Sequence, residues 1–422
     1  MAKMLLSAMP FTGHVAPLLA IAAALAGRGH EVRVYTGAAF RPAVEDVGAR
    51  WIGWRRAPDF DENDLPATFP RLVGRKGIAQ VMVNMRDLFI ATGPAQVADL
   101  EAEWEREPWD VFAADEASIA PRLFAEKSGC AWAAVAVLPL NLPSGQGPPS
   151  GIGLAPGANP VTRARDAALR ALVPVFAGPL RRPTERARAA VGLPPSREVY
   201  SEAVFAAEMI LASGVPALDY RRSDRPNRLH WVGQLQGGAS QHPSLPSWWS
   251  ELDGRRVVLV SQGTQNIDPE DLIRPALSAL EDVDAVVVAT TGVRGHDAFD
   301  FAVPANARVA GFVPFDLLLP RVDVAITNGG WGGTLAVLAH GIPLVVAGGD
   351  LDKPEVAARV ANSGGGVDLG TGRPSQRAIR AGFDRVAADP AYRDAAHGIA
   401  DDLRAAGGAA RAAELLEQLA PV

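Results

Sequence analysis

The segment Thr327–Gly341 combines residue types that suit anion binding. It reads TNGGWGGTLAVLAHG and follows the apolar run Val322–Ile326. Its glycines let the backbone turn tightly and come close to a ligand. The helix expected from Thr334 would present unpaired N–H groups and the positive end of its dipole to an anion. This pattern predicts a phosphate-binding loop, although a tight strand-to-helix turn without a ligand explains the glycines equally well.

A polar cluster follows the next apolar run, Leu344–Ala347. The cluster reads Asp350-Leu-Asp-Lys-Pro-Glu355 and lies at the carboxyl end of that expected strand. Ligands of open α/β sheets bind outside the carboxyl ends of the strands. The phosphate loop and the polar cluster would then face one crevice, which suits an anion that carries a hydroxyl-rich group.

A histidine and an aspartate follow two other expected strands. His14 comes shortly after Met4–Ala8, and Asp115 comes directly after Asp110–Ala114. A histidine at this sheet edge can accept a proton near neutral pH, provided that a carboxylate orients its ring. The pair is therefore a candidate general base with its orienting partner. The alternative is that each side chain only caps the helix beside it.

Other motifs are weaker or missing. Ser261-Gln-Gly-Thr-Gln265 follows the run Val257–Val260, and its hydroxyls and amides could hold a diphosphate from the side opposite the glycine loop. No pair of histidines or cysteines has the spacing of a metal site. No Gly-x-Gly-x-x-Gly follows the first strand, and no Gly-x-Ser-x-Gly elbow occurs, which disfavours a nicotinamide enzyme and a serine hydrolase.

The composition is that of a globular protein with more than one domain. The chain has 422 residues, of which 48% are hydrophobic and 21% charged, with a net charge of −6. No block of basic residues points to nucleic acid. No apolar run is long enough for stable membrane insertion, and the single cysteine, Cys130, excludes an internal disulfide. These features predict a cytoplasmic protein.

Short apolar runs alternate with helical patterns along the whole chain, which favours parallel sheets covered by helices. The first half has five expected strands and the second half repeats the scheme, so we expect an α/β protein with two Rossmann-like halves. Proline and glycine residues mark a joint between them. The expected division is an N-terminal domain over 1–220, a linker over 221–251, a second domain over 252–403, and a helix over 404–422 that packs back toward the N-terminal domain.

These motifs together resemble a known family. The Gly-His-x-x-Pro opening, the Ser261-x-Gly-Thr264 loop, Gly311-Phe-Val-Pro314 and the block Thr327–Gly366 occur in the order and spacing of the GT-B-fold, nucleotide-sugar-dependent glycosyltransferases of family 1. The resemblance covers nearly the whole chain. It is strongest with the actinobacterial enzymes that decorate macrolides, polyketide antibiotics and other secondary metabolites. It implies two Rossmann-like β/α/β domains that face a deep interdomain cleft.

The resemblance also implies roles for individual residues. His14 matches the general base and Asp115 its orienting aspartate. The residues expected to bind the donor fall into four groups. They are Ser261, Gly263 and Thr264 on one wall of the diphosphate site, Asn328, Gly330, Gly332, Gly333 and Thr334 in the diphosphate cradle, Phe312 and Val313 at the nucleotide base, and Asp352 and Lys353 at the sugar. Residues expected to line the acceptor pocket are Phe11, Phe60, Met82, Met85, Phe89 and Leu142.

Three positions depart from the family pattern. Asn328 stands where most members have a diphosphate-binding histidine, so a hydrogen-bond donor remains without the positive charge. Phe315 replaces a residue that is usually polar and lies near the nucleotide base. Lys353 replaces a glutamine and could pair with Asp352 instead of binding sugar.

The expected activity is that of an inverting, metal-independent glycosyltransferase. It would move a sugar or deoxysugar from a TDP- or UDP-sugar, its only co-substrate and with no cofactor, to a hydroxyl of an apolar natural product. A monomer or homodimer is expected. The alternatives are a non-catalytic nucleotide-sugar-binding or auxiliary protein of a biosynthetic complex, and a GT-B-fold sugar-nucleotide epimerase or a phosphorylase.

Overall fold

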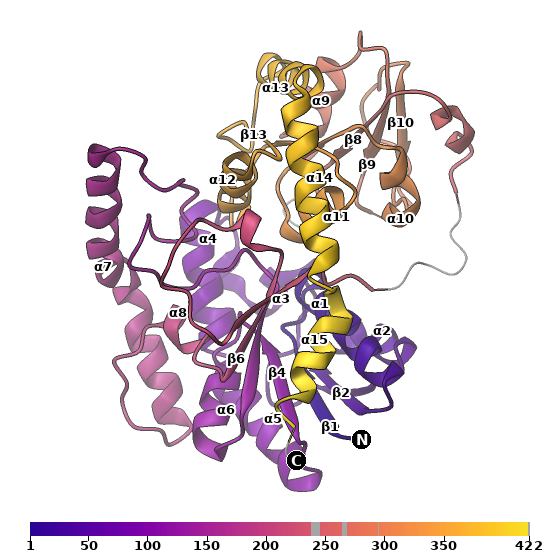
Figure 1. The fold of residues 1–422 in the computed structure, drawn as a ribbon. Helices are drawn as coiled ribbons and strands as arrows, with labels where there is room; N and C mark the ends of the chain where they lie inside the picture. Colours follow the sequence, from indigo (N-terminus) through magenta and orange to yellow (C-terminus); the bar gives the residue numbers. More distant parts are fainter. Residues whose placement is uncertain (238–244, 264–267, 294, 421–422) are drawn as a thin grey trace.

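The computed structural model describes residues 1–237, 245–263, 268–293 and 295–420. It contains two sheets in which all paired strands are parallel, and each sheet with its helices forms one of the two units that lie one above the other in Figure 1. We call them the N-terminal unit and the C-terminal unit. Within the described ranges, no helix combines the length and the apolar character that crossing a bilayer requires.

The N-terminal sheet has seven strands. In spatial order they are β3 (Arg50–Gly53), β2 (Glu31–Thr36), β1 (Lys3–Ser7), β4 (Val111–Asp115), β5 (Trp132–Ala136), β6 (Met209–Ser213) and β7 (Leu229–Gly233). Both faces are covered, since Leu5 of β1 packs into one apolar core while Met4 and Leu6 pack into another. A strand buried on both faces reads as a continuous apolar run, which is why the central strands were predictable.

The C-terminal sheet has six strands. In spatial order they are β10 (Ala307–Ala310), β9 (Val286–Thr290), β8 (Val257–Ser261), β11 (Val324–Thr327), β12 (Leu344–Val346) and β13 (Gly366–Asp368). Strands β9 and β10 are added on one side of β8, whereas β11 to β13 are added on the other. Ligands of open α/β sheets bind at such a switch in strand order, here between β8 and β11.

Helices cover the faces of both sheets (Figure 1). In the N-terminal unit they are α1 (Thr12–Gly27), α2 (Arg41–Asp46), α3 (Leu65–Thr68), α4 (Gly77–Val83), α5 (Gly93–Arg106), α6 (Ala120–Ser128), α7 (Pro160–Ala190) and α8 (Tyr200–Ala203). Those that follow are α9 (Ile273–Ala279), α10 (Phe315–Leu318), α11 (Trp331–Ala339), α12 (Lys353–Ser363), α13 (Gln376–Ala388), α14 (Pro390–Ala405) and α15 (Gly408–Glu417).

Three short strands, β3, β7 and β13, are absent from the sequence-based prediction. All three lie at sheet edges, where a strand has a neighbour on one side only and carries a weaker apolar signal. β7 falls within the segment 221–251 that was interpreted as a linker, so the first sheet extends further along the chain than residue 220. Residues 238–244 of that segment lie outside the described residues.

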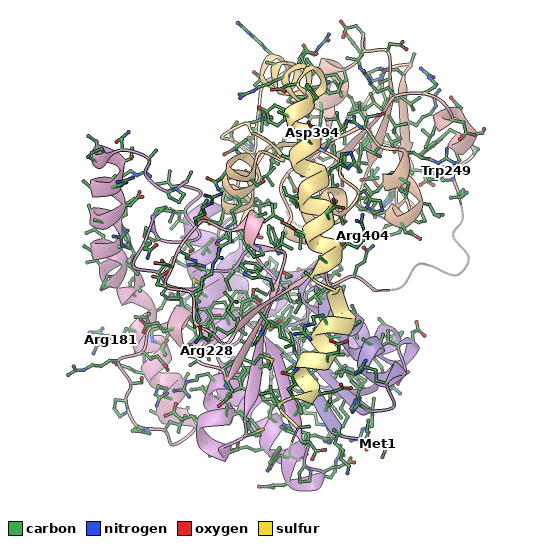
Figure 2. The ribbon with its side chains drawn as sticks, viewed as in Figure 1. Met1, Arg181, Arg228, Trp249, Asp394 and Arg404 are labelled. Atoms are coloured by element: carbon green, nitrogen blue, oxygen red, sulfur yellow. The ribbon has the colours of Figure 1, made fainter. Side chains whose placement is uncertain are left out.

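The C-terminal segment passes from one unit to the other. The sequence predicted one helix over 404–422, but α14 ends at Ala405 and α15 begins at Gly408. At this break a Cβ on Gly233 of β7 would lie 2.6 Å from the carbonyl oxygen of Leu403, so the crossing requires close backbone approach. Figure 2, in which Asp394 and Arg404 mark α14, shows this helix on the C-terminal unit and α15 on the N-terminal unit.

α15 is fastened to the N-terminal unit by polar and apolar contacts. Arg28 and His30, which flank the turn between α1 and β2, both bond the carboxylate of Glu417 at 2.7 Å. Leu416 is fully buried in the core beneath α1. The last helix therefore belongs structurally to the N-terminal unit, although the C-terminal unit precedes it in the chain.

Leu416→Ala tests this attachment. We expect it to lower the free energy of unfolding of the N-terminal unit by about 2–5 kcal/mol, because it leaves a cavity in a packed core. Urea denaturation followed by tryptophan fluorescence measures the change. Glu414→Ala, on the exposed face of the same helix, should cost less than about 0.5 kcal/mol. Equal costs for both variants would contradict the packing of α15 on α1.

Candidate active site

His14 and Asp115 meet at the carboxyl edge of the N-terminal sheet. α1 begins at Thr12, so His14 lies in the first turn of this helix. Its Nδ1 is 3.1 Å from Oδ2 of Asp115, and the two residues are only 8% and 2% exposed. The sequence-based pairing of these residues therefore matches their placement in the structure.

The carboxylate of Asp115 is held by two backbone groups as well as by the imidazole. Oδ2 accepts a hydrogen bond from the N–H of Met9 at 2.8 Å, and Oδ1 accepts one from the N–H of Ala117 at 3.0 Å. With Nδ1–H donating to this carboxylate, the neutral ring carries its lone pair on Nε2. The geometry therefore prepares Nε2 to accept a proton.

Charges around His14 favour its protonated form. Burial lowers the pKa of His14, but the charge and hydrogen bond of Asp115, followed by the charges of Glu116 and Asp352, more than offset this and raise it above the usual value. Asp352 belongs to the C-terminal unit. The candidate base and the start of α12 are thus close enough to interact electrostatically across the two units.

Glu116 is a buried acid that the sequence reasoning missed. Its oxygens accept hydrogen bonds from the N–H groups of Val137 and Leu138 just beyond β5, at 3.0 and 2.9 Å. Burial raises the pKa of its carboxyl to about 7. The signal in the sequence was the second acid directly after Asp115 at a strand end.

An aromatic cluster borders His14. The ring of Phe11 lies 5.6 Å from the imidazole, 5.1 Å from Phe60 and 6.4 Å from Phe89, measured between centroids. Phe60 and Leu142 are buried, whereas the other four predicted acceptor residues, Phe11, Met82, Met85 and Phe89, are half-buried and pack against the same core. Phe11 therefore presents partly exposed apolar surface beside His14, and Phe89 adjoins Phe11.

Two of these side chains lie on a segment whose conformation the sequence did not indicate. Met85 and Phe89 belong to η3 (Asn84–Ile90), which has π-helical hydrogen bonding. Such segments are rare and occur often at functional sites. The wider turn changes which side chains of this segment share one face.

The loops that follow β8 and β11 contact one another in the C-terminal unit. Ser261 pairs in register with Thr327, which brings the two strand ends together. The amide of Asn328 joins the loops, because its Nδ2 donates to the carbonyl of Gln262 and its Oδ1 accepts from the N–H of Gly330 at 3.4 Å. Asn328 therefore has a structural bond where a diphosphate contact was predicted. Gly263 adjoins it, and Thr264 lies outside the described residues.

The glycines of this loop lie at the start of α11. The helix begins at Trp331, three residues before the predicted start, with Gly330 at its N-cap. A Cβ added at Gly332 or Gly333 would meet no other part of the described chain within 4 Å. Their N–H groups belong to a first turn, which lacks intrahelical partners and attracts anions. The glycines for which a phosphate cradle was predicted thus lie at the start of α11.

Thr334 lies beneath the first turn of α11. It is fully buried, and its N–H donates to the carbonyl of Gly330 at 2.9 Å. Its hydroxyl has no hydrogen-bond partner among the described residues. The backbone N–H of Thr334, a residue predicted to contact a diphosphate, is therefore already used in a hydrogen bond within the helix.

Trp331 fixes the cradle relative to the N-terminal unit. Its indole N–H donates to Oγ of Ser213 at the end of β6, at 2.9 Å, and a Cβ on Gly214 would lie 2.8 Å from its ring. Sequence reasoning treated this tryptophan as part of the glycine loop only. Its position between two pairs of glycines was the signal that a large side chain is needed there.

The remaining predicted donor residues lie after β10 and β12. Phe312 is 50% exposed, as a stacking platform requires, whereas Val313 beside it is buried. Asp352 is half-buried at the start of α12, and Nζ of Lys353 donates to Oδ1 of Asp350 at 3.0 Å. Burial raises the pKa of the Asp352 carboxyl overall, although the charge of Lys353 also acts on this carboxyl and lowers its pKa. Leu351 has a φ of 54°, an unfavourable left-handed conformation in the turn between β12 and α12.

The structure therefore places a buried histidine–aspartate pair beside an aromatic cluster on the N-terminal unit and a glycine-rich helix start on the C-terminal unit, and Trp331 contacts both units. Among the described residues, no three His, Cys, Asp or Glu side chains are grouped so as to hold a metal ion.

Known proteins match this chain over its whole length. 4'-Demethylrebeccamycin synthase of Lentzea aerocolonigenes is 39% identical over 423 residues, 99% of this chain and 99% of that protein. A family model described as "Erythromycin biosynthesis protein CIII-like, C-terminal domain" matches residues 274–419.

Two solved structures share the architecture. The glycotransferase of kitacinnamycin has a TM-score of 0.74 and 25% identity, covering 100% of this chain and 99% of that one. Glycosyltransferase VinC in complex with DTDP has a TM-score of 0.68 and 20% identity, covering 99% of each chain. The second likeness concerns the fold alone.

Asp115→Asn tests the electrostatics of His14. Removing the carboxylate charge leaves burial as the dominant influence, so we expect the pKa of His14 to fall. A pH titration of the imidazole by NMR, assigned with His14→Gln, gives the value. Asp110→Asn is the matched control, because Asp110 bonds the backbone of Lys3 at the opposite end of the same strands. An unchanged pKa in Asp115→Asn would contradict the pairing.

Proposed function

The chain belongs to the GT-B-fold, nucleotide-sugar-dependent glycosyltransferases of family 1 that serve antibiotic biosynthesis, and from this membership we propose that it transfers a sugar with inversion to a hydroxyl of an apolar acceptor. The observation that carries the proposal is the His14–Asp115 pair beside the aromatic wall, joined to the cradle of α11 through the Trp331–Ser213 contact. A base without an anion site, or an anion site without a base, would not support the same reaction.

The proposed step is a direct displacement. Nε2 of His14 takes the proton of the acceptor hydroxyl as its oxygen forms a bond to the anomeric carbon of the sugar. The bond from that carbon to the diphosphate oxygen breaks on the opposite face, and the electron pair leaves with the diphosphate. Asp115 stabilises the imidazolium that forms, and the first-turn N–H groups of α11 stabilise the charge on the leaving group.

This mechanism makes the reaction depend on pH. The base must be neutral to accept a proton, so the rate falls as the pH drops through the pKa of His14. Because that pKa is raised above the usual histidine value, the rate loss begins at a higher pH than for a free imidazole.

We propose a TDP-sugar, with a UDP-sugar as the alternative donor. Exposed Phe312 would stack on the base, and Asp352 with Lys353 would bond hydroxyls of the sugar. The complex of VinC with DTDP supports a thymidine nucleotide in a protein of the same fold. The acceptor we propose is an apolar natural product, because Phe11 lies beside His14, Phe89 adjoins Phe11, and both rings keep partly exposed apolar surface.

His14→Ala tests the base. We expect kcat for transfer to fall by about 10²–10⁴-fold, the usual contribution of a general base, while TDP still binds. Release of TDP in the presence of an acceptor, and thermal stabilisation by TDP alone, measure the two effects. His340→Ala is the control, because that imidazole bonds the backbone of Ala336 within α11. Full activity in His14→Ala would exclude His14 as the base.

Gly332→Asp tests the cradle. A carboxylate in the first turn favours the helix but repels a diphosphate. We therefore expect TDP at a hundredfold excess over its Kd to stabilise the wild type by about 2.7 kcal/mol and the variant hardly at all. Gly398→Asp, also exposed with open space around it, should respond like the wild type. Stabilisation by NAD alone, or by none of TDP, UDP and GDP, would refute the donor assignment and favour an auxiliary protein.

A further inference from the structure

α12 carries a second set of charged residues beyond the turn assigned to the donor sugar. Glu355 and Arg359 are 2% and 1% exposed, and Nε of Arg359 donates to Oε1 of Glu355 at 2.9 Å. Buried charges are costly unless they are paired and hydrogen-bonded. Their other partners lie on the N-terminal unit, so the two residues bridge the units.

Glu355 holds the glycine-rich segment that precedes α7. Its Oε2 accepts hydrogen bonds from the N–H groups of Gly151 and Gly153, at 3.0 and 3.1 Å. A Cβ on Gly153 would lie 2.9 Å from Cβ of Pro354 and 3.0 Å from its carbonyl oxygen, at a φ of +69°. The segment therefore sits directly on the first turn of α12, where only glycine fits.

Arg359 extends the bridge to the chain beyond β5. Its Nη2 donates to the carbonyl of Leu140 at 2.8 Å, and its Nη1 lies 3.3 Å from Oδ1 of Asp219. Leu140 is followed two residues later by Leu142, whose carbonyl accepts a hydrogen bond from Arg222 at 2.8 Å. The bridge thus reaches the backbone of the predicted acceptor wall.

We propose that Glu355 and Arg359 are positioning residues that hold the segment 140–153 of the acceptor side on the donor helix α12. This inference rests on the proposed function, which places the sugar at Asp352 and Lys353. One short helix then touches the sugar with its first residues and the acceptor side with its next two turns. A nucleotide sugar that orders the start of α12 also orders the segment 140–153, so donor binding prepares the acceptor site.

A purely structural role for the bridge makes a different prediction. Loss of the bridge would then loosen the segment 140–153 to the same extent with and without donor. The discriminating quantity is therefore the change in protection that the donor causes, not the protection itself.

Hydrogen–deuterium exchange of peptides covering 140–153, with and without TDP-glucose, measures that quantity. In the wild type we expect TDP-glucose to slow their exchange by about threefold or more, because it suppresses local opening. Glu355→Gln removes the buried charge and should abolish the slowing. Gly153→Ala disrupts the same contact from the loop side and leaves the Glu355–Arg359 pair intact, so it serves if Glu355→Gln folds poorly.

Asp224→Asn is the matched control. Asp224 accepts a hydrogen bond from the N–H of Gly145 at 2.7 Å and so holds the same segment, but from within the N-terminal unit. This variant should keep the donor-dependent slowing. The proposal is overturned if TDP-glucose shifts the melting temperature of the wild type but leaves its exchange over 140–153 unchanged. It is also overturned if TDP-glucose slows this exchange in Glu355→Gln and Gly153→Ala as much as in the wild type. Failure of TDP-glucose to bind the wild type would instead refute the donor assignment, and this inference with it.

Discussion

The carboxylate of Asp115 is the constraint on which the candidate site depends. It bonds the backbone beyond β1, the turn after β4 and the ring of His14, so the base is fixed by the same group that joins two central strands. A buried carboxylate needs these three donors, and the imidazole needs the carboxylate to place its lone pair on Nε2. Neither the sheet edge nor the orientation of the base can change without the other.

The second constraint is the relation between the two units. Each supplies half of the proposed reaction, since the base and apolar wall lie on one and the anion cradle on the other. Trp331, Arg359 and the glycine at the end of β7 fix this relation through buried contacts. A site assembled in this way brings the two substrates together and excludes water, whose attack would waste the donor.

The central strands, the meeting of His14 with Asp115 and the glycine-rich turn before α11 could be predicted from the sequence, because buried parallel strands are apolar runs and their carboxyl ends share an edge. The edge strands β3, β7 and β13 could not, since they bury less. The break between α14 and α15 does have a local signal, since Gly407 and Gly408 both adopt positive φ, and the prediction of one continuous helix overlooked it. The contact of Trp331 with Ser213, by contrast, is tertiary and has no local pattern in the sequence. The same holds for the loop-joining role of Asn328 and for the partners of Glu355 and Arg359.

The anomeric configuration of the product tests the central claim most directly. TDP-glucose or UDP-glucose, both α-linked, would be incubated with hydroxylated aromatic acceptors, and the glycoside formed would be examined by proton NMR. Direct displacement by a hydroxyl that His14 deprotonates gives the β-glycoside. An α-glycoside would contradict the single displacement, because retention requires a different course of reaction at the anomeric carbon.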